Sequence, residues 1–357
     1  MSNQEQKLQK YHADDLRQFA VQLLEATGMD SNMAAVVAEV LVDGDLFGHT
    51  THGLALLAGY IDQIERKEMQ IQGEPEILQE KGATLFLDGK KLPGPWLVNY
   101  SLEKLIPKAK EYGVATAVIK KSHHIACLAS YLMRAIKENT LVMIASSDPA
   151  VQSVAPFGGT KAVLTPNPIA MGIPADSPFM IDISASITTN GLSNRYAAEN
   201  KVFDEEWFID AQGNPSNNPK VLFDNPPGTI LPLGGLSVGH KGFGLGLMVE
   251  ALTAGLAGFG RSQNPQGWGA TVHITVYDLN AFGGEADFYQ EMNWIGELCR
   301  TNPPREGFEQ VRMPGDRALA LYQQYQKQGV VLHPSIMPKL IEIAHKYEIS
   351  APFSIGA

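Results

Sequence analysis

The chain has 357 residues, of which 44% are hydrophobic, so it is long enough to bury a sizeable core and to divide into two domains. Its 38 acidic residues outnumber its 28 lysines and arginines, and the net charge of −10 argues against nucleic acid and anionic membranes as partners. The two cysteines, Cys127 and Cys299, fit neither a disulfide framework nor a cysteine-rich zinc site, which makes a reducing, cytoplasmic location the expectation.

The N-terminal part is expected to be helical. Apolar residues recur at helical spacing over residues 13–28, where Asp14 or Asp15 can cap the first turn. A second helix is predicted over residues 32–47, with Ser31 as its cap. The polar start of the chain has no apolar signal core, and no stretch reaches the roughly 18 uninterrupted apolar residues of a membrane span.

From about residue 76 the pattern changes, because strand-like segments begin to alternate with helical ones. The strand-like segments are 83–90, 114–122, 141–148, 161–174, 178–186 and 271–279. Such alternation is typical of an α/β sheet domain. The tail is helical again from residue 316 onward. We therefore expect one helical domain made of residues 1–75 and 300–357, beside an α/β domain of residues 76–299.

The stretch FGHTTHG at residues 47–53 carries two histidines at or just after the end of the second helix. His49 and His52 lack the spacing and the glutamate base of a zinc hydrolase motif. A histidine at a helix end can instead interact with the last carbonyl groups of the helix. The third interpretation is a proton donor, His52, oriented by the hydroxyl of Thr51. The pattern alone leaves all three open.

Other segments combine glycine or proline turns with polar side chains, namely KSHH at 121–124, PFGGTKAVLTPNP at 156–168, VGHKGFG at 238–244 and VRMPG at 311–315. The third of these is neither a P-loop nor a Rossmann fingerprint, but Lys241 and the free N–H groups of a helix start can bind an anion. Asp182 follows an apolar run and precedes small hydroxyl residues, and a buried aspartate in such a place is usually paired or hydrogen-bonded and can orient a histidine. Taken singly, each motif is explained equally well by a turn, a cap or close helix packing.

The order and spacing of these motifs resemble those of one family, the type 2 malate/L-lactate dehydrogenases, over nearly the whole chain. The family includes sulfolactate, ureidoglycolate and diketogulonate oxidoreductases and the cyclic-imine carboxylate reductases. The matching motifs are Thr51-His52-Gly53, Ser122-His123-His124 with Ala126 in place of the usual glycine, Gly158-Gly159 with Asn167-Pro168, Asp182 to Ser186, Lys241-Gly242 with Gly244, and Arg312 with Pro314-Gly315.

The resemblance implies an α/β fold of the sulfolactate dehydrogenase type, which is not a Rossmann fold. In such a fold, a helical domain built from both chain ends accompanies a sheet domain that holds a nicotinamide cofactor. The resemblance also implies a homodimer, whose active site lies between the domains and is completed at the subunit interface. The expected cofactor is NAD, with NADP left open, and the expected partner is a small 2-hydroxy or 2-oxo acid.

Carried over residue by residue, the resemblance makes His52 the general acid and base, tuned and oriented by Thr51 and Asp182. The substrate pocket would be lined by His124, Leu56, Pro166 and Asn167. The cofactor would contact Met180, Ile181, Asp182, Ile183, Ser184, His240, Lys241, Arg312, Met313, Pro314 and Gly315. No metal is expected, and His49 is interpreted as a helix-end residue.

Two positions depart from the family pattern. Leu56 stands where many members carry an arginine that grips the substrate carboxylate. Pro166 stands where many have a threonine before Asn-Pro. Both changes remove polar contacts, so we expect a larger or less polar acid, or a carboxylate held by Lys121 or Arg195.

Four functions remain open at this point. The first is a nicotinamide-dependent dehydrogenase of a 2-hydroxy acid, and the second is a cyclic-imine-2-carboxylate reductase that uses the same histidine. The third is a metal-dependent hydrolase whose ligands would be His49, His52, His123 and His124. The fourth is a catalytically inactive member of the family that serves as a binding or scaffold protein.

Overall fold

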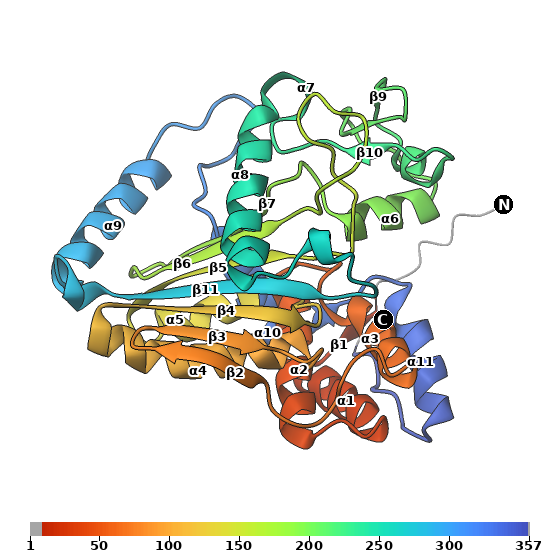
Figure 1. Cartoon of the computed structure of the whole chain (residues 1–357), viewed down its shortest axis with the longest axis horizontal. Coiled ribbons are helices and arrows are strands. Elements are labelled where there is room, and N and C mark those ends of the chain that lie inside the picture. The colour runs from red at the N-terminus through yellow and green to blue at the C-terminus, as the bar shows by residue number, and fades with distance from the viewer. Residues whose placement is uncertain (1–8, 356–357) are drawn as a thin grey trace.

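A seven-stranded mixed sheet forms the middle layer of the computed structural model, which describes residues 9–355 (Figure 1). The strands, in spatial order, are β2 (Glu76–Lys81), β3 (Thr84–Asp88), β4 (Val114–Ser122), β11 (Ala270–Asp278), β5 (Thr140–Ser147), β6 (Pro168–Ile173) and β7 (Phe179–Ser184). Only the β3–β4 pair is parallel among these neighbours. Strand β11 is buried from Ala270 to Val276, because protein covers both faces of the sheet centre.

Helices from both ends of the chain, together with two helices from residues 94–136, lie on one side of the sheet (Figure 1). They are α1 (Ala13–Ala26), α2 (Ser31–Leu46), α3 (Leu57–Glu65), α4 (Gly94–Tyr112), α5 (Ala129–Ile136), α10 (Asp316–Gln328) and α11 (Ile336–Lys346). Helix α10 packs on α2, and α11 packs on α3. A two-residue antiparallel ladder between β1 (Lys10–Tyr11) and β12 (Val330–Val331) joins the two ends of the chain.

The other side of the sheet carries a second layer with its own small core (Figure 1). Its elements are α6 (Asn190–Ala198), α7 (Gly235–Val238), α8 (His240–Glu250) and a three-stranded sheet of β8 (Phe208–Ile209), β9 (Pro215–Ser216) and β10 (Thr229–Ile230). Helix α8 continues into a π-helical turn at Ala251–Gly255 that contacts the sheet. Helix α9 (Glu285–Arg300) lies at one end of the molecule (Figure 1).

The helix caps differ from those expected. Asp30 caps α2, since its carboxylate accepts hydrogen bonds from the amides of Asn32 and Met33, so the prediction of Ser31 was wrong by one position. Helix α1 follows His12 without a side-chain cap, and Asp14 and Asp15 lie inside its first turn. There they still favour the helix, because negative charge stabilises its N-terminus.

One continuous core contains residues of the helices from both chain ends and of the sheet. We therefore keep as a prediction the division into a helical domain of residues 1–75 and 300–357 and a sheet domain of residues 76–299. Residues 1–8 and 356–357 of the predicted helical domain lie outside the described part of the chain. None of the helices found between residues 9 and 355 combines the length and the apolar character that crossing a membrane requires.

Candidate active site

The turn that carries His49 and His52 is fixed on the last residues of α2. A methyl group at Gly53 would lie 2.4 Å from the carboxylate of Asp45, and one at Gly44 would lie 2.9 Å from the carbonyl oxygen of His52. Asp45 is buried, and its Oδ2 accepts a hydrogen bond of 2.7 Å from the amide of Leu54. The His52-Gly53 segment can approach α2 this closely only because both Gly44 and Gly53 lack a side chain, which gives a physical reason for the glycine after His52.

The imidazole of His52 is half-buried and is held by two neighbours. Its Nδ1 lies 2.9 Å from the hydroxyl oxygen of Thr51, and its ring stacks on that of His124 with centroids 6.0 Å apart. Burial lowers the pKa of His52 to about 4, and the nearby charges of His49 and Arg195 act in the same direction. The ring is therefore neutral at pH 7 in the free chain.

His124 is also neutral, and its tautomer follows from its partners. The amide N–H of Ala126 donates to His124 Nδ1 over 3.2 Å, and the hydroxyl of Tyr60 lies 3.0 Å from the same nitrogen. The proton of the ring must then be on Nε2, which can donate a hydrogen bond. Burial keeps the pKa of His124 well below its usual range, and Trp268 packs on its ring at 4.6 Å between centroids.

His123 points into the core instead of the candidate site. Its side chain is fully buried, and neither ring nitrogen has a hydrogen-bond partner among residues 9–355. The rings of Tyr60 and Trp268 pack edge-on against it at 5.5 and 5.4 Å. The four histidines considered as hydrolase ligands do not form a group, because the ligand atoms that lie close together in the described chain belong to His49, Cys127 and Asp182.

Asp182 lies beside His49, and its hydrogen bonds go elsewhere than to His52. Its Oδ2 accepts from the amide of Ala129 at 2.9 Å and lies 3.9 Å from the sulfur of Cys127. Burial raises the pKa of Asp182, and the charge of His49 opposes this shift. The expected orientation of His52 by Asp182 stays a prediction, whereas a hydrogen bond between Thr51 and His52 is present.

Of the two cations expected near the substrate, only Arg195 contacts the turn. Its guanidinium donates to the hydroxyl and the carbonyl oxygen of Thr50 at 2.8 and 2.7 Å. Lys121 is paired with Asp88 at 3.1 Å instead.

The three segments expected to bind the cofactor converge on β7. The amide of Met180 donates to the carbonyl oxygen of Pro314 at 3.0 Å, which places the 312–315 turn along this strand. At the other end of β7, a methyl group at Gly242 would lie 2.7 Å from the carbonyl oxygen of Ala185, so the first turn of α8 packs there. The cations of both flanking segments, Lys241 and Arg312, are exposed.

This arrangement fits a nicotinamide dinucleotide. Such a cofactor needs close approach to backbone and positive charge for its pyrophosphate. Lys241 and Arg312 supply exposed positive charge, and Gly244 of α8 has open space beside its backbone, whereas Gly242 and Gly315 are packed against protein.

Pro166 and Asn167 are both buried between β7 and α8. The amide of Ala185 donates to the carbonyl oxygen of Pro166 at 2.9 Å. The side-chain nitrogen of Asn167 donates to the carbonyl oxygen of Gly246 at 3.1 Å and to Glu250 at 3.0 Å. Leu56 lies in the short helix Leu54–Leu56 that follows the turn and packs on the main core.

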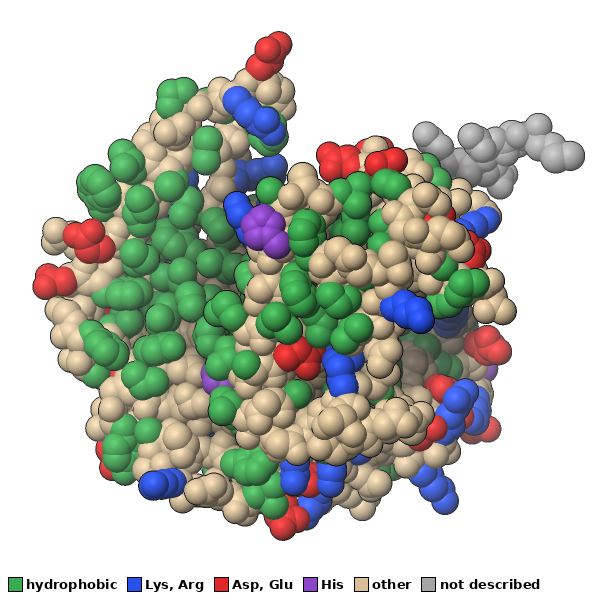
Figure 2. All heavy atoms as spheres, turned by 45° about the horizontal axis from the view of Figure 1, so that its top comes forward, with side chains coloured by type: hydrophobic (Ala, Val, Ile, Leu, Met, Phe, Trp, Pro, Cys, Tyr) green, Lys and Arg blue, Asp and Glu red, His purple; other side chains and the backbone are tan. Residues whose placement is uncertain are grey.

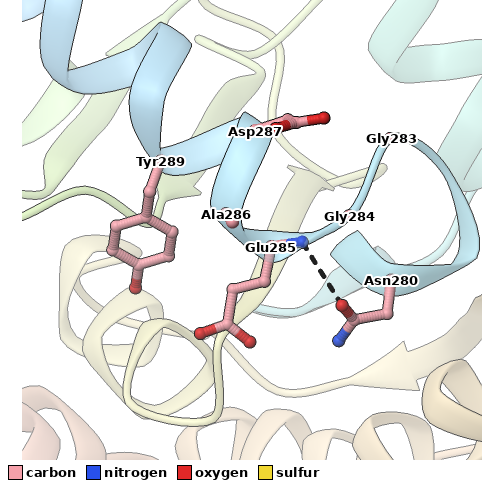
Figure 3. Close-up of a pocket in the computed structure, with 7 residues that line it drawn as sticks. All are labelled: Asn280, Gly283, Gly284, Glu285, Ala286, Asp287 and Tyr289. Carbon is pink, nitrogen blue, oxygen red and sulfur yellow. Dashed lines mark hydrogen bonds between the residues drawn. The ribbon is translucent and has the colours of Figure 1, made fainter.

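A surface hollow at the start of α9 lies apart from all these residues. It is lined by Asn280, Gly283, Gly284, Glu285, Ala286, Asp287 and Tyr289 (Figure 3). It contains none of the residues predicted for the site.

Sequence reasoning missed Asp45, Tyr60 and Trp268. Trp268 stands alone between two glycines in the sequence, and only the packing of its loop on His124 shows its place.

Comparisons with known proteins show the family of the chain. A family model described as malate/L-lactate dehydrogenase matches residues 11–341. Malate dehydrogenase of Pyrococcus horikoshii is 28% identical over 343 residues, which cover 93% of this chain and 94% of that protein. (2R)-3-sulfolactate dehydrogenase (NADP(+)) of Chromohalobacter salexigens is 30% identical over 315 residues, which cover 85% and 89%. The crystal structure of malate dehydrogenase from Entamoeba histolytica has a TM-score of 0.91 and 26% identity, and covers 97% of this chain and 100% of that one.

The fold and the comparisons define an oxidoreductase of the 2-hydroxyacid dehydrogenase class. The chain belongs to the malate/L-lactate dehydrogenase family, whose members use NAD(P)H. The mixed α/β fold expected from the sequence is confirmed by the match to the Entamoeba enzyme.

Proposed function

We propose that the chain transfers a hydride between a nicotinamide cofactor and the second carbon of a 2-hydroxy or 2-oxo acid, with His52 as proton acceptor and donor. The observation that carries this proposal is the fixed His52 ring. Thr51 engages its Nδ1, which leaves Nε2 as the nitrogen for proton exchange with the substrate oxygen.

The proposed cofactor is NAD, which supplies or accepts the hydride when it is bound. Lys241, in the first turn of α8, would hold its pyrophosphate, while β7 and the 312–315 turn would contact the rest of the cofactor. NADP is to be tested beside it, because no side chain of the described site distinguishes the two.

The proton moves between His52 and the substrate oxygen. In the oxidation, neutral His52 takes the hydroxyl proton as the C–H bond gives up its hydride. In the reduction, protonated His52 donates to the oxygen that would otherwise become an alkoxide. The Nε2–H of His124, left free by the contacts at Nδ1, would donate a hydrogen bond to the same substrate.

Arg195 is the proposed partner of the substrate carboxylate. It holds Thr50 with two of its N–H groups, and its charge acts on His52, so the two lie close together. A guanidinium has five N–H donors, so others remain for a carboxylate. A bound carboxylate would also raise the pKa of His52, because an opposite charge stabilises the protonated ring.

The wall of the proposed pocket is apolar and aromatic. Leu56 adds no polar group, and the half-buried Trp268 packs on the ring of His124. This lining supports an acid with a larger or less polar side group than that of lactate or malate.

A homodimer is proposed on the basis of the surface around α8 and α9, where Figure 2 shows a broad hydrophobic area. Its exposed apolar side chains are Leu247, Met248, Leu256, Phe282, Trp294, Ile295 and Leu298. Contiguous apolar surface of this kind marks protein contacts.

The test combines binding and turnover. NADH and NADPH fluorescence titrations are followed by turnover assays with 2-oxo acids and, in parallel, with cyclic-imine-2-carboxylates. We expect NADH binding, turnover of a 2-oxo acid, and a loss of kcat of roughly 10²–10⁴ in His52→Ala, the range for a missing general acid.

His49→Ala serves as the matched control, because it changes a histidine of the same turn. It is expected to lose much less activity than His52→Ala. Faster turnover of a cyclic imine than of a 2-oxo acid would identify the chain as a cyclic-imine-2-carboxylate reductase. If neither dinucleotide binds, the remaining hypothesis is a catalytically inactive binding or scaffold protein. An essential His49 beside a dispensable His52 would overturn the proton-donor assignment.

A further inference from the structure

Three potential metal ligands from separate parts of the chain meet beside the candidate site. They are His49 of the turn after α2, Cys127 before α5, and Asp182 of β7. One ligand atom of each residue lies within 4.8 Å of the others. Cys127 is buried, and His49 and Asp182 are half-buried.

The donor set is suited to zinc. Imidazole nitrogen, thiolate sulfur and carboxylate oxygen bind Zn²⁺ at about 2.0–2.3 Å in a tetrahedron, so the ligand atoms of an occupied site lie roughly 3.3–3.8 Å apart. The sulfur of Cys127 and Oδ2 of Asp182 are already 3.9 Å apart. Small side-chain rotations would bring a ring nitrogen of His49 to the same distance, and water would be the fourth ligand of the ion.

The fold holds two of the three ligand side chains in position. The amide of Ala129, at the start of α5, donates to Oδ2 of Asp182 at 2.9 Å, so this carboxylate is already oriented. Cys127 also packs closely on α2, since a methyl group at Gly44 would lie 3.3 Å from its Cβ. Two of the three ligands are thus held by the scaffold before any ion arrives.

We propose that His49, Cys127 and Asp182 form an inhibitory zinc site. Binding would release the thiol proton of Cys127 to solvent, and the thiolate and the carboxylate would together balance the two positive charges of the ion. The inhibitory effect rests on the proposed function, because the ion would tie the turn that carries His52 to β7. Catalysis itself would need no metal.

The site is tested first without any measurement of activity. Co²⁺, which takes the place of Zn²⁺, is added to the metal-free full-length chain. A thiolate ligand then gives a near-ultraviolet charge-transfer band, and one proton is released for each ion bound. We expect one Co²⁺ per chain and displacement by one Zn²⁺.

The variants separate this site from the rest of the molecule. Cys127→Ala and Cys127→Ser should abolish the band and weaken zinc binding by more than about 100-fold, since loss even of groups that merely support a ligand costs 10–100-fold. Cys299→Ala is the matched control, because it removes the other cysteine, on α9, and should leave the band unchanged. Cys127→Ser keeps nearly the volume of cysteine, so it provides the same test if the alanine variant does not fold.

The turnover arm then tests inhibition. Wild-type turnover should survive EDTA, fall when zinc is added, and recover with chelator, while Cys127→Ala should keep its turnover in zinc. A band that persists in both Cys127 variants, or no band in the wild type, would overturn the site. If zinc binds and turnover is unchanged, the site stands and its inhibitory effect is contradicted. If the chain shows no turnover with any substrate, the Co²⁺ absorption band still tests the site, independently of the proposed function.

Discussion

The low pKa of His52 decides how pH should act on the proposed reaction. A ring with a pKa of about 4 is already the required base at neutral pH, whereas only a small protonated fraction is available as an acid. We expect kcat/KM for reduction to rise about tenfold for each unit as pH falls from about 8 to 6, and kcat/KM for oxidation to stay level, because kcat/KM reports the free enzyme. Profiles in both directions check this. An inflection near the ordinary histidine pKa would contradict it.

His123 offers a test of stability at the scale of one residue. Burial lowers its pKa to about 3, so below the ordinary value of 6.5 the unfolded chain binds a proton that the folded chain does not. Its contribution to stability therefore falls as pH drops from about 6.5, by roughly 2 kcal/mol at pH 5. His123→Phe should gain that amount relative to wild type between pH 7.5 and pH 5 in denaturant unfolding. The exposed His345→Phe should show no such gain.

Whether a residue's place in the candidate site can be predicted from the sequence differs from residue to residue. His52 was proposed because a short motif surrounds it, and its hydrogen bond to Thr51 lies within that motif. Asp45 and Trp268 gave no such signal, because their places depend on packing between distant segments. The contacts of Asp182 with Ala129 and Cys127 gave no such signal either, for the same reason.

At the scale of elements, α8 carries the prediction for the cofactor. Lys241 is exposed in the first turn of this helix, where the N–H groups and the side chain can bind a phosphate together. Lys241→Ala should weaken NADH binding by about 1–3 kcal/mol, the range for a lost hydrogen bond to a charged group. The exposed Lys339→Ala of α11 is the control. An unchanged dissociation constant for Lys241→Ala would argue against this position for the cofactor.

Helices with a clear apolar stripe were predicted from the sequence, whereas α6 and α9 were not. Helix α6, NGLSNRYAA, is polar and contains poor helix formers, so it depends on its cap Thr189 and on packing. Helix α9 leaves Trp294 and Leu298 exposed in the single chain, so its apolar residues do not mark a face turned toward the core.

At the scale of the whole molecule, the apolar surface of α8 and α9 predicts self-association. We expect a dimer in light scattering coupled to size exclusion. Because Trp294 and Met248 are 60% and 59% exposed on this surface, Trp294→Asp with Met248→Glu should shift the chain toward monomer while the circular dichroism stays that of a folded protein. The pair Phe223→Asp with Phe353→Asp, on exposed apolar residues elsewhere, is the control. A monomeric wild type would contradict the prediction.

The short ladder between β1 and β12 has a consequence for the order of events during synthesis. Tyr11 can pair only after Val330 has left the ribosome, so the contacts between the start of the chain and its tail wait for nearly the whole sequence. Contacts between such distant residues slow folding, since a very long loop must close first. During that delay the side of α2 that packs on α10 lacks its final partner, and this is the period in which a nascent chain is most prone to aggregate.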